Sequence, residues 1–344
     1  MRVQAAFFAL VIGSVTTSSF APPVLAQSAE DFYKGRQIML IIGFAPGGGY
    51  DAYARLAGRH MGKQLPGSPT IVPQNMPLAG GLRAANYLFQ VAVRDGSVIG
   101  ALANNIMEQQ ILGGENITYA AERYAWIGRL NPMNEAQIVW RNAGVHSVED
   151  AKLRVAVLGA SGPTATPSVY PRVLNNIVGT KFQIVMGYKG APDSCLAMER
   201  GEVSGCMVDL GLVKATKAHW LKENSVSILY QMALQADADF PNVPTYSSLG
   251  RSNDERKMLS VYSFSSDVGR SIMAPPEIPA DRIEVLRKAF SAMVKDKEFI
   301  ADAQRAKMDL NVLAGEDLQK IIDDAAQISP AIIQRAKAAR DNVQ

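Results

Sequence analysis

Short apolar runs alternate with longer segments of helical period along most of the chain. Residues 38–44, IMLIIGF, form a continuous apolar run that leads into a proline-glycine turn, which predicts a strand buried on both faces of a parallel sheet. Further apolar runs predict strands at 70–73, 98–103, 153–158, 182–186 and 226–230. Segments with helical spacing predict helices at 51–63, 82–92, 167–178, 192–200 and 212–222. Repeated strand-helix units of this kind predict an α/β fold with mostly parallel sheets.

The last third of the chain changes character after a proline-rich turn at 274–279. Helical spacing there predicts helices at 280–295, 298–307 and 316–328, with no strong strand signal between them. Such a helical tail is expected to pack on an existing sheet. The sequence has no repeat with a period of about 20 to 50 residues, which excludes a solenoid.

The first 26 residues have the three-part pattern of a secretory signal. Arg2 precedes an apolar run of about 11 residues, and small residues end the segment at Ala26. The apolar run is well short of the ~20 residues that a membrane-spanning helix needs. We therefore expect residues 1–26 to be a signal peptide cleaved after Ala26, and the mature protein to be exported to the periplasm. An uncleaved N-terminal anchor is the alternative.

Composition narrows the class of protein further. The chain has 344 residues, enough for two domains, and its 48% hydrophobic and 19% charged residues are typical of globular proteins. Lys+Arg 35 against Asp+Glu 32 gives a net charge of +3, which argues against nucleic acid as a partner. Export would bring Cys195 and Cys206 to a compartment where disulfides persist, but the sequence leaves open whether they pair or are two buried thiols.

A glycine-rich turn joins the apolar run at 38–44 to the helix that follows. It reads Phe44-Ala45-Pro46-Gly47-Gly48-Gly49-Tyr50-Asp51. Glycines allow positive φ and close approach to the backbone, and N–H groups at the start of a helix attract anions. The turn lacks the Lys-Ser/Thr ending of a P-loop and the spaced glycines of a dinucleotide-binding motif. We interpret it as a carboxylate-binding loop; the alternative is a structural turn with Asp51 as the helix N-cap.

Two more loops of this kind follow other predicted strands, at 75–81 and 159–166. All three loops lie at the carboxyl ends of strands, where open α/β sheets bind their ligands, so together they predict a binding cleft. Hydroxyl groups in the third loop can donate hydrogen bonds to an anion, and a tyrosine after a fourth strand can form a wall of the cleft. The residues expected to contact the ligand in this part of the chain are Ala79, Gly80, Gly81, Ser161, Gly162, Thr164 and Tyr188.

No catalytic constellation is evident in the sequence. The three histidines, His60, His146 and His219, are scattered and lack metal-binding spacing. Ser161 follows a predicted strand, but its surroundings are not a nucleophile elbow and no base can be paired with it. We therefore expect no enzyme activity, no cofactor and no bound metal. A periplasmic hydrolase that uses Ser161 is the weaker alternative.

The order of these motifs resembles the Bug (TctC-like) periplasmic solute receptors, the binding components of tripartite tricarboxylate transporters. The resemblance covers essentially the whole mature chain. It departs from the family pattern at Leu78 and Ala84, where glycine is usual, and at Pro163 in the third loop. The motifs that carry it are the signal segment, Pro46-Gly47-Gly48 with Asp51, Asn75 before Ala79-Gly80-Gly81, Tyr188-Lys189-Gly190, and Ala274-Pro275 with Pro279-Ala280 before a helix.

The resemblance implies a two-lobed periplasmic binding protein of type II (a Venus flytrap), with a mostly parallel sheet in each lobe and a ligand cleft between the lobes. We expect the first lobe over residues 27–130 and 262–344 and the second over 131–261. The implied ligand is a small carboxylate, di- or tricarboxylic or aromatic, which a monomeric receptor delivers to a two-subunit membrane permease. Presentation of the ligand to a membrane sensor is the alternative, and the sequence leaves the identity of the carboxylate open.

Overall fold

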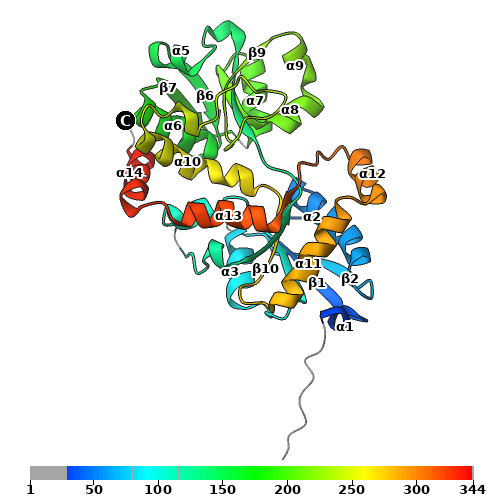
Figure 1. The fold of residues 1–344 in the computed structure, drawn as a ribbon. Coiled ribbons are helices and arrows are strands. Elements are labelled where there is room, and N and C mark those ends of the chain that lie inside the picture. Colours follow the sequence, from blue (N-terminus) through cyan, green and yellow to red (C-terminus); the bar gives the residue numbers. More distant parts are fainter. Residues whose placement is uncertain (1–28, 79–80, 115, 164, 189, 343–344) are drawn as a thin grey trace, which may run out of the picture.

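The computed structural model describes residues 29–342 except 79–80, 115, 164 and 189, and it arranges them around two β-sheets (Figure 1). The predicted signal segment lies outside the described residues. So do three of the expected ligand contacts, Ala79, Gly80 and Thr164, and also Lys189. None of the helices in the described part of the chain is long and apolar enough to cross a bilayer.

The first sheet has six strands in the order β11-β4-β10-β3-β1-β2. They are β1 (Gln37–Ile42), β2 (Thr70–Asn75), β3 (Val98–Ala101), β4 (Ala125–Arg129), β10 (Ser271–Ala274) and β11 (Leu313–Ala314). β1 pairs in parallel with β2 and β3, whereas β10 is antiparallel to β3 and β4, and β11 is antiparallel to β4. Ile38, Leu40, Ile41 and Ile42 of β1 are fully buried, as the apolar run predicts, whereas Met39 is exposed.

The second sheet has five strands in the order β7-β6-β8-β5-β9. They are β5 (Glu135–Trp140), β6 (Ala156–Ala160), β7 (Phe182–Met186), β8 (Gly205–Asp209) and β9 (Val226–Gln231). β6 is parallel to β7 and β8, and β5 runs antiparallel to β8 and β9. Cys195 and Cys206 form a disulfide, which answers the question that the sequence left open.

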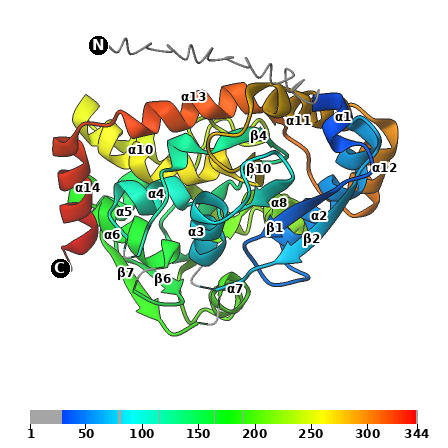
Figure 2. The same cartoon turned by 90° about the horizontal axis from the view of Figure 1, so that it is seen from below.

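Helices cover both sheets (Figures 1 and 2). Those beside the first sheet are α1 (Ala29–Tyr33), α2 (Gly49–Met61), α3 (Leu82–Gln90), α4 (Ile106–Ile111), α11 (Ala280–Met293), α12 (Lys297–Arg305) and α13 (Gly315–Ala326). Those beside the second are α5 (Val148–Leu153), α6 (Thr166–Val178), α7 (Ala191–Glu199), α8 (Leu210–Thr216) and α9 (Ala218–Lys222). α11 and α12 pack on α2, and α13 packs on β4, so much of the C-terminal tail lies on the first sheet.

Two further helices connect the halves of the molecule. α10 (Asn253–Val268) contacts α4 and α13, and α14 (Pro330–Asp341) contacts both α10 and α6. Figure 2 shows α14 beside α6, at the far end of α13. The expected lobe boundary between residues 261 and 262 falls inside the continuous helix α10, and the lobe assignment stays a prediction.

The chain crosses between the two sheets twice, and the crossings lie side by side. The first crossing is residues 130–134, between β4 and β5, and the second enters β10 at Ser271. Backbone hydrogen bonds join them: Leu130 N–H donates to the Arg270 carbonyl at 3.0 Å, and Arg270 N–H donates to the Asn131 carbonyl at 2.9 Å. These paired crossings form the floor between the lobes.

Candidate functional site

The first glycine loop lies between the end of β1 and the start of α2. Gly47 has φ +89°, a conformation that favours glycine, and Gly48 is the N-cap of α2. A Cβ on Gly48 would meet nothing closer than the Ala45 carbonyl oxygen at 4.0 Å. The three glycines are exposed, so a ligand can reach the main-chain N–H groups at the start of this helix. Beside them the rings of Phe44 and Tyr50 stack with centroids 4.1 Å apart.

Asp51 holds this loop together. Its Oδ2 accepts a hydrogen bond from Gly47 N–H at 2.9 Å, and its Oδ1 accepts from Arg55 Nε and Asn75 Nδ2, each at 2.8 Å. Burial acts to raise the pKa of Asp51, but hydrogen bonds from Arg55, Gly47 and Asn75 lower it to about 2. The N-cap alternative for Asp51 is wrong, because Gly48 is the cap and Asp51 lies in the first turn of α2. Both carboxylate oxygens face protein donors, so a direct contact of Asp51 with a ligand stays a prediction.

The second loop is tied to the first through Asn75, whose Nδ2 also donates to the Phe44 carbonyl at 2.8 Å. Gly81 has φ +92° and caps α3. A Cβ built on Gly81 would lie 3.1 Å from the Ala103 Cβ, so the loop packs closely against the chain after β3. The two glycine loops of the first lobe therefore form one connected edge.

The third loop connects β6 to α6. Ser161 is exposed, and the Gly162 carbonyl accepts hydrogen bonds from Ser168 Oγ at 2.6 Å and from Ala165 N–H at 3.2 Å. Tyr188 N–H donates to the Ala160 carbonyl at 3.2 Å. A Cβ on Gly159 would lie 3.2 Å from the Tyr188 ring, so this tyrosine packs against β6 beside the third loop.

A cavity of about 770 Å³ lies between α4 and the start of α3 on one side and the third loop and α6 on the other, with Arg340 and Asp341 of α14 also lining it. Leu82 follows the second loop, and Pro163 and Thr166 belong to the third loop and the start of α6. Asn105 and Glu108, at the start of and within α4, line the cavity from the first lobe. The third loop thus reaches this interlobe cavity through Pro163 and Thr166, and the second loop adjoins it only at Leu82. None of the expected ligand contacts that the structure describes is among the residues that line it. Within the described residues, those that line it do not include 44–51, whose Tyr50 hydroxyl accepts from Asn104 N–H at 3.0 Å nearby.

Two carboxyl groups beside this cavity have strongly raised pKa values. Burial raises the pKa of Glu108 to about 8, although the Tyr170 hydroxyl, 3.1 Å from Oε2, and Ser265 form hydrogen bonds with it. Burial raises the pKa of Glu135 to about 7; a hydrogen bond with Thr166 lowers it and the charge of Asp209 raises it. Raised pKa values of this kind are typical of functional sites.

Arg270 is the cation at the other end of the cleft floor. Its guanidinium lies over the Tyr53 ring, 4.6 Å from the centroid, and a Cβ on Gly49 would be 3.5 Å from its Nη2. Arg270 is therefore next to the N-terminal turn of α2. Burial raises the pKa of Asp209 and the charge of Arg270 opposes that shift. Sequence reasoning missed Glu108, Glu135 and Arg270, since none of them stands in a recognisable motif.

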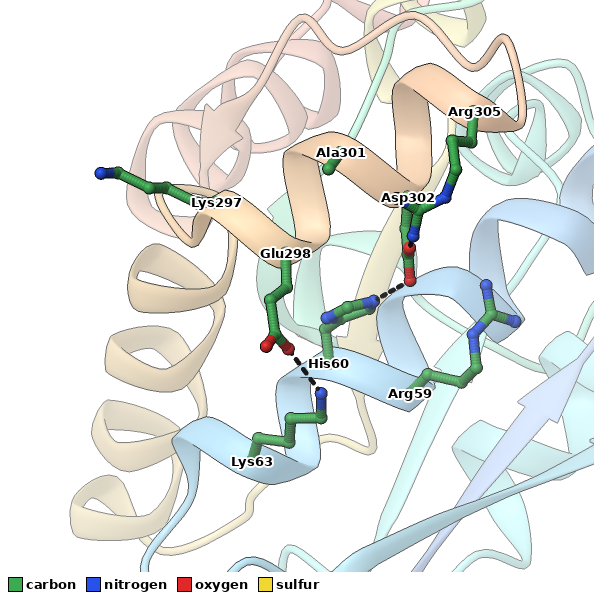
Figure 3. Close-up of a pocket in the computed structure, with 8 residues that line it drawn as sticks. All are labelled: Arg59, His60, Lys63, Lys297, Glu298, Ala301, Asp302 and Arg305. Atoms are coloured by element: carbon green, nitrogen blue, oxygen red, sulfur yellow. Dashed lines mark hydrogen bonds and ion pairs between the residues drawn. The ribbon is translucent and has the colours of Figure 1, made fainter.

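A second pocket, of about 650 Å³, lies on the outer side of the first lobe between α2 and α12 (Figure 3). His60 Nε2 lies 2.7 Å from Asp302 Oδ2, and Lys63 Nζ lies 2.9 Å from Glu298 Oε2. Ligand atoms of His60, Asp296 and Glu298 lie within 4.8 Å of one another, as a metal site requires. However, Lys63, Arg59, Lys297 and Arg305 surround them, and this positive charge disfavours a cation. The interlobe cavity is the better candidate for function.

The chain matches known proteins over most of its length. Residues 53–337 match the model of the family described as tripartite tricarboxylate transporter family receptor. A UPF0065 protein encoded in the TAR-I ttuE-ttuC' intergenic region of Agrobacterium vitis is 26% identical over 291 residues, 80% of this chain and 75% of that protein.

Solved structures share the fold. A TctC solute binding protein from Polaromonas, solved with no ligand, has a TM-score of 0.66 at 21% identity over 89% of this chain and 98% of its own. MatC from Rhodopseudomonas palustris, solved with bound malate, has a TM-score of 0.57 at 19% identity over 89% of this chain and 99% of its own. At these identities the likeness shows a common fold of two α/β lobes.

Proposed function

The chain belongs to the family of tripartite tricarboxylate transporter receptors, and we propose that it is a periplasmic receptor that captures a small carboxylate and delivers it to a two-subunit membrane permease. The resemblance drawn from the sequence is confirmed by this membership, and so is the prediction of a binding protein and not an enzyme. The α/β fold with two lobes is also confirmed. The prediction of a mostly parallel sheet in each lobe is wrong, because antiparallel pairings involving β10, β11 and β5 make both sheets mixed.

The first glycine loop is the observation that carries the proposal. Its exposed glycines present main-chain N–H groups at the start of α2, where the helix dipole favours an anion. The Asp51 carboxylate accepts hydrogen bonds from Gly47, Arg55 and Asn75. These donors compensate its charge, so Asp51 stabilises the loop without repelling a bound anion. The malate bound to MatC is a ligand of the proposed class in a protein of the same fold.

Closure of the lobes would bring the third loop onto the bound carboxylate. Ser161 offers an exposed hydroxyl, and Gly162 an open backbone, at the start of α6. Release would follow when the permease stabilises the open form, because a partner shifts a conformational equilibrium toward the state that it binds better.

Titration of residues 27–344 with a panel of carboxylates by isothermal calorimetry tests the proposal. At least one carboxylate should bind, and Gly48→Val should weaken it by about tenfold or more, equivalent to about 1.4 kcal/mol. The space around Gly48 lets the variant fold, because its φ of −83° suits valine and no atom crowds the added side chain. Ala301→Val, on the outer helix α12, adds the same kind of side chain away from the cleft and should leave the affinity unchanged.

Failure of every carboxylate to bind ligand-free protein would overturn the proposal. Denaturing mass spectrometry confirms beforehand that no ligand was carried through purification. Equal affinity of the native protein and Gly48→Val would overturn the role of the first glycine loop.

A further inference from the structure

Two acidic residues face each other at the cleft edge of the second sheet. Glu135 begins β5 and stands directly opposite Asp209, the last residue of the antiparallel neighbour β8. Directly opposed residues have Cβ atoms about 4.5–5.5 Å apart, so their side chains are neighbours on one face of the sheet. Glu135 also follows the first crossing between the lobes, residues 130–134. The floor of the cleft therefore carries two carboxyl groups side by side.

A third carboxyl group approaches from the first lobe. Glu108, on α4, accepts a hydrogen bond from the Tyr170 hydroxyl at 3.1 Å, while Thr166 hydrogen bonds Glu135. Thr166 and Tyr170 are one turn apart on α6, on the same face of that helix, and both line the interlobe cavity. Glu108 and Glu135, from different lobes, thus flank one stretch of α6.

None of these three carboxyl groups has an ion-pair partner in the part of the chain that the structure describes. Asp209, however, accepts a hydrogen bond from Leu212 N–H at 3.0 Å and is acted on by the charge of Arg270, so Glu108 and Glu135 are the less compensated pair. The charge of Arg340 lowers the pKa of Glu108, but Arg340 forms its ion pair with Asp341, whose Oδ1 lies 2.6 Å from Arg340 Nε. Buried like charges are costly unless a cation or donor compensates them. A ligand that brings only further negative charge would add to this cost, whereas a ligand with a cationic group would reduce it.

Buried acceptor atoms on the same face add an independent observation. Gln137 follows Glu135 by two residues on β5, so both side chains lie on one face of the sheet. The partner of Gln137 on the neighbouring strand β9 is Tyr230. Gln137 and Tyr230 are fully buried, yet Gln137 Oε1 and the Tyr230 hydroxyl lack hydrogen-bond partners among the described residues. The Gln137 amide nitrogen donates to the Cys206 carbonyl at 3.1 Å, which leaves its oxygen as the free acceptor.

Asn105, which lines the cavity next to Glu108, also has a buried amide oxygen that no donor among the described residues reaches. Buried polar atoms are almost always satisfied in native proteins, by protein groups, water or ligand. At the cavity the unsatisfied amide atom, Asn105 Oδ1, is an acceptor, and so are the Glu108 and Glu135 carboxyl groups once they have released their protons. The complementary ligand group is therefore one with several N–H donors and a positive charge.

We infer that the ligand carries an ammonium group besides its carboxylate, as an amino acid does, and that Glu135 and Glu108 determine this specificity by accepting hydrogen bonds from the ammonium. This inference rests on the proposed function, because the first glycine loop supplies the carboxylate end of the site. Arg270, beside Gly49, places positive charge at that end. The charge pattern of the cleft thus matches a zwitterion.

Matched ligand pairs test the inference by calorimetry near pH 8.5, where both Glu108 and Glu135 release their protons and the ligand ammonium keeps its own. The pairs are L-aspartate with succinate, L-glutamate with glutarate, and 4-aminobutyrate with butyrate. In at least one pair the amino member should bind about tenfold or more tightly than its partner. If the unsubstituted acid binds as well or better in every pair that binds, the inference is overturned and the proposed function stands. If no acid of either kind binds the ligand-free protein, the proposed function falls, and the inference with it.

Glu135→Gln then tests whether Glu135 is responsible for the preference for the amino member of each pair. The substitution keeps the shape and removes the charge, so the preference for the amino member should fall about tenfold. Glu298→Gln, in the outer pocket of Figure 3, makes the same chemical change away from the cleft and should leave the preference intact. Glu108→Gln is the second variant if Glu135→Gln does not fold. An unchanged preference in the variants that fold would overturn the inference.

Discussion

The interlobe cavity and the outer pocket between α2 and α12 are similar in size, about 770 and 650 Å³, but their charges are arranged differently. In the outer pocket His60 and Arg305 both contact Asp302, and Lys63 pairs with Glu298. In the cleft, Glu108 and Glu135 have hydroxyl partners and no ion pair within the described residues. Charged groups that pair within the protein stabilise its structure, whereas groups without an ion-pair partner favour binding of an external ligand.

The comparison also shows that location alone does not decide how a carboxyl group behaves. Asp51 lies in the first glycine loop, at the edge of the cleft, yet its pKa is lowered to about 2 because three donors surround it. The pKa of Glu108 is raised to about 8, because the effect of burial outweighs the hydrogen bonds from its two hydroxyl partners. The balance between burial and the number and charge of the neighbouring donors separates the two pKa values.

Removing the Asp51 carboxylate is expected to have the largest effect. Asp51→Ala leaves Gly47 N–H, Arg55 and Asn75 without their shared acceptor. Loss of one partner from a buried charged network costs about 3 kcal/mol or more, so we expect that decrease in the free energy of unfolding, measured by urea denaturation at neutral pH. In the native protein this contribution is present above about pH 4 and lost as the pH falls toward 2, because the folded-state pKa is depressed.

Asp51→Asn is the milder control, since it keeps an acceptor oxygen in place. It should cost less than the alanine variant. A decrease below about 1 kcal/mol for Asp51→Ala would mean that the loop does not depend on this network, and the contrast with Glu108 would lose its basis.

Neutralising Glu108 should stabilise the protein, an effect of opposite sign. The folded protein holds the Glu108 proton up to about pH 8, whereas the unfolded chain releases it near 4.5. Stability of the native protein therefore falls as the pH rises from about 5 to 8. Glu108→Gln should unfold with at least about 2 kcal/mol more free energy than the native protein at pH 8, and with a similar free energy at pH 5. The groups that act on Glu108 are Tyr170, Ser265, Glu135 and Arg340.

Urea denaturation at pH 5, 6.5 and 8 measures this difference. Glu298→Gln is the matched control, because Glu298 is largely exposed and paired with Lys63. Identical pH dependence in Glu108→Gln and the native protein would show that the cleft carboxyl carries no electrostatic cost. The cleft would then be no different from the outer pocket in this respect.

The sequence predicts the parts of the fold whose signal is local. The apolar run at 38–44, the glycine turn after it and the helices on either side of β7 all appear close to their expected bounds. β4, β5, β8, β10 and β11 were missed. Glycine or charged residues shorten the apolar runs of β4, β5 and β8, and β10 and β11 have only four and two residues. α10 was missed because serines interrupt its apolar spacing; Ser263, Ser265 and Ser266 are nevertheless buried. Burial of this kind depends on the other elements and leaves no periodic pattern.

The candidate site likewise has a part that the sequence predicts and a part that it does not. The glycine loops carry a signature in the residues themselves, and the family resemblance strengthens it. Glu108 and Glu135 are 27 positions apart with no motif around either, and they come together only because α4, β5 and α6 meet at the cleft. The specificity of the site therefore depends on tertiary structure, which a single sequence does not reveal.

The smallest effect is expected in the outer pocket. His60→Ala removes the contact with Asp302 and the edge-on packing against Phe299, whose ring centroid is 5.6 Å away. We expect about 1–2 kcal/mol of destabilisation by urea denaturation at pH 8 and no change in ligand affinity. Burial lowers the pKa of His60, and Lys63 and Arg59 lower it further, against the opposing charges of Asp296 and Glu298.

The pH dependence of this variant separates a structural role from a functional one. The unfolded chain takes up a proton on His60 below about pH 6.5 and the folded protein resists it, so the native protein loses stability there as the pH falls. The cost of His60→Ala should therefore shrink from pH 8 to pH 5. Lys63→Met, which removes an exposed ion pair, should change stability by less than about 1 kcal/mol at either pH. A loss of ligand affinity in His60→Ala would contradict the comparison, because it would mean that a pocket whose carboxylates are paired within the protein takes part in binding.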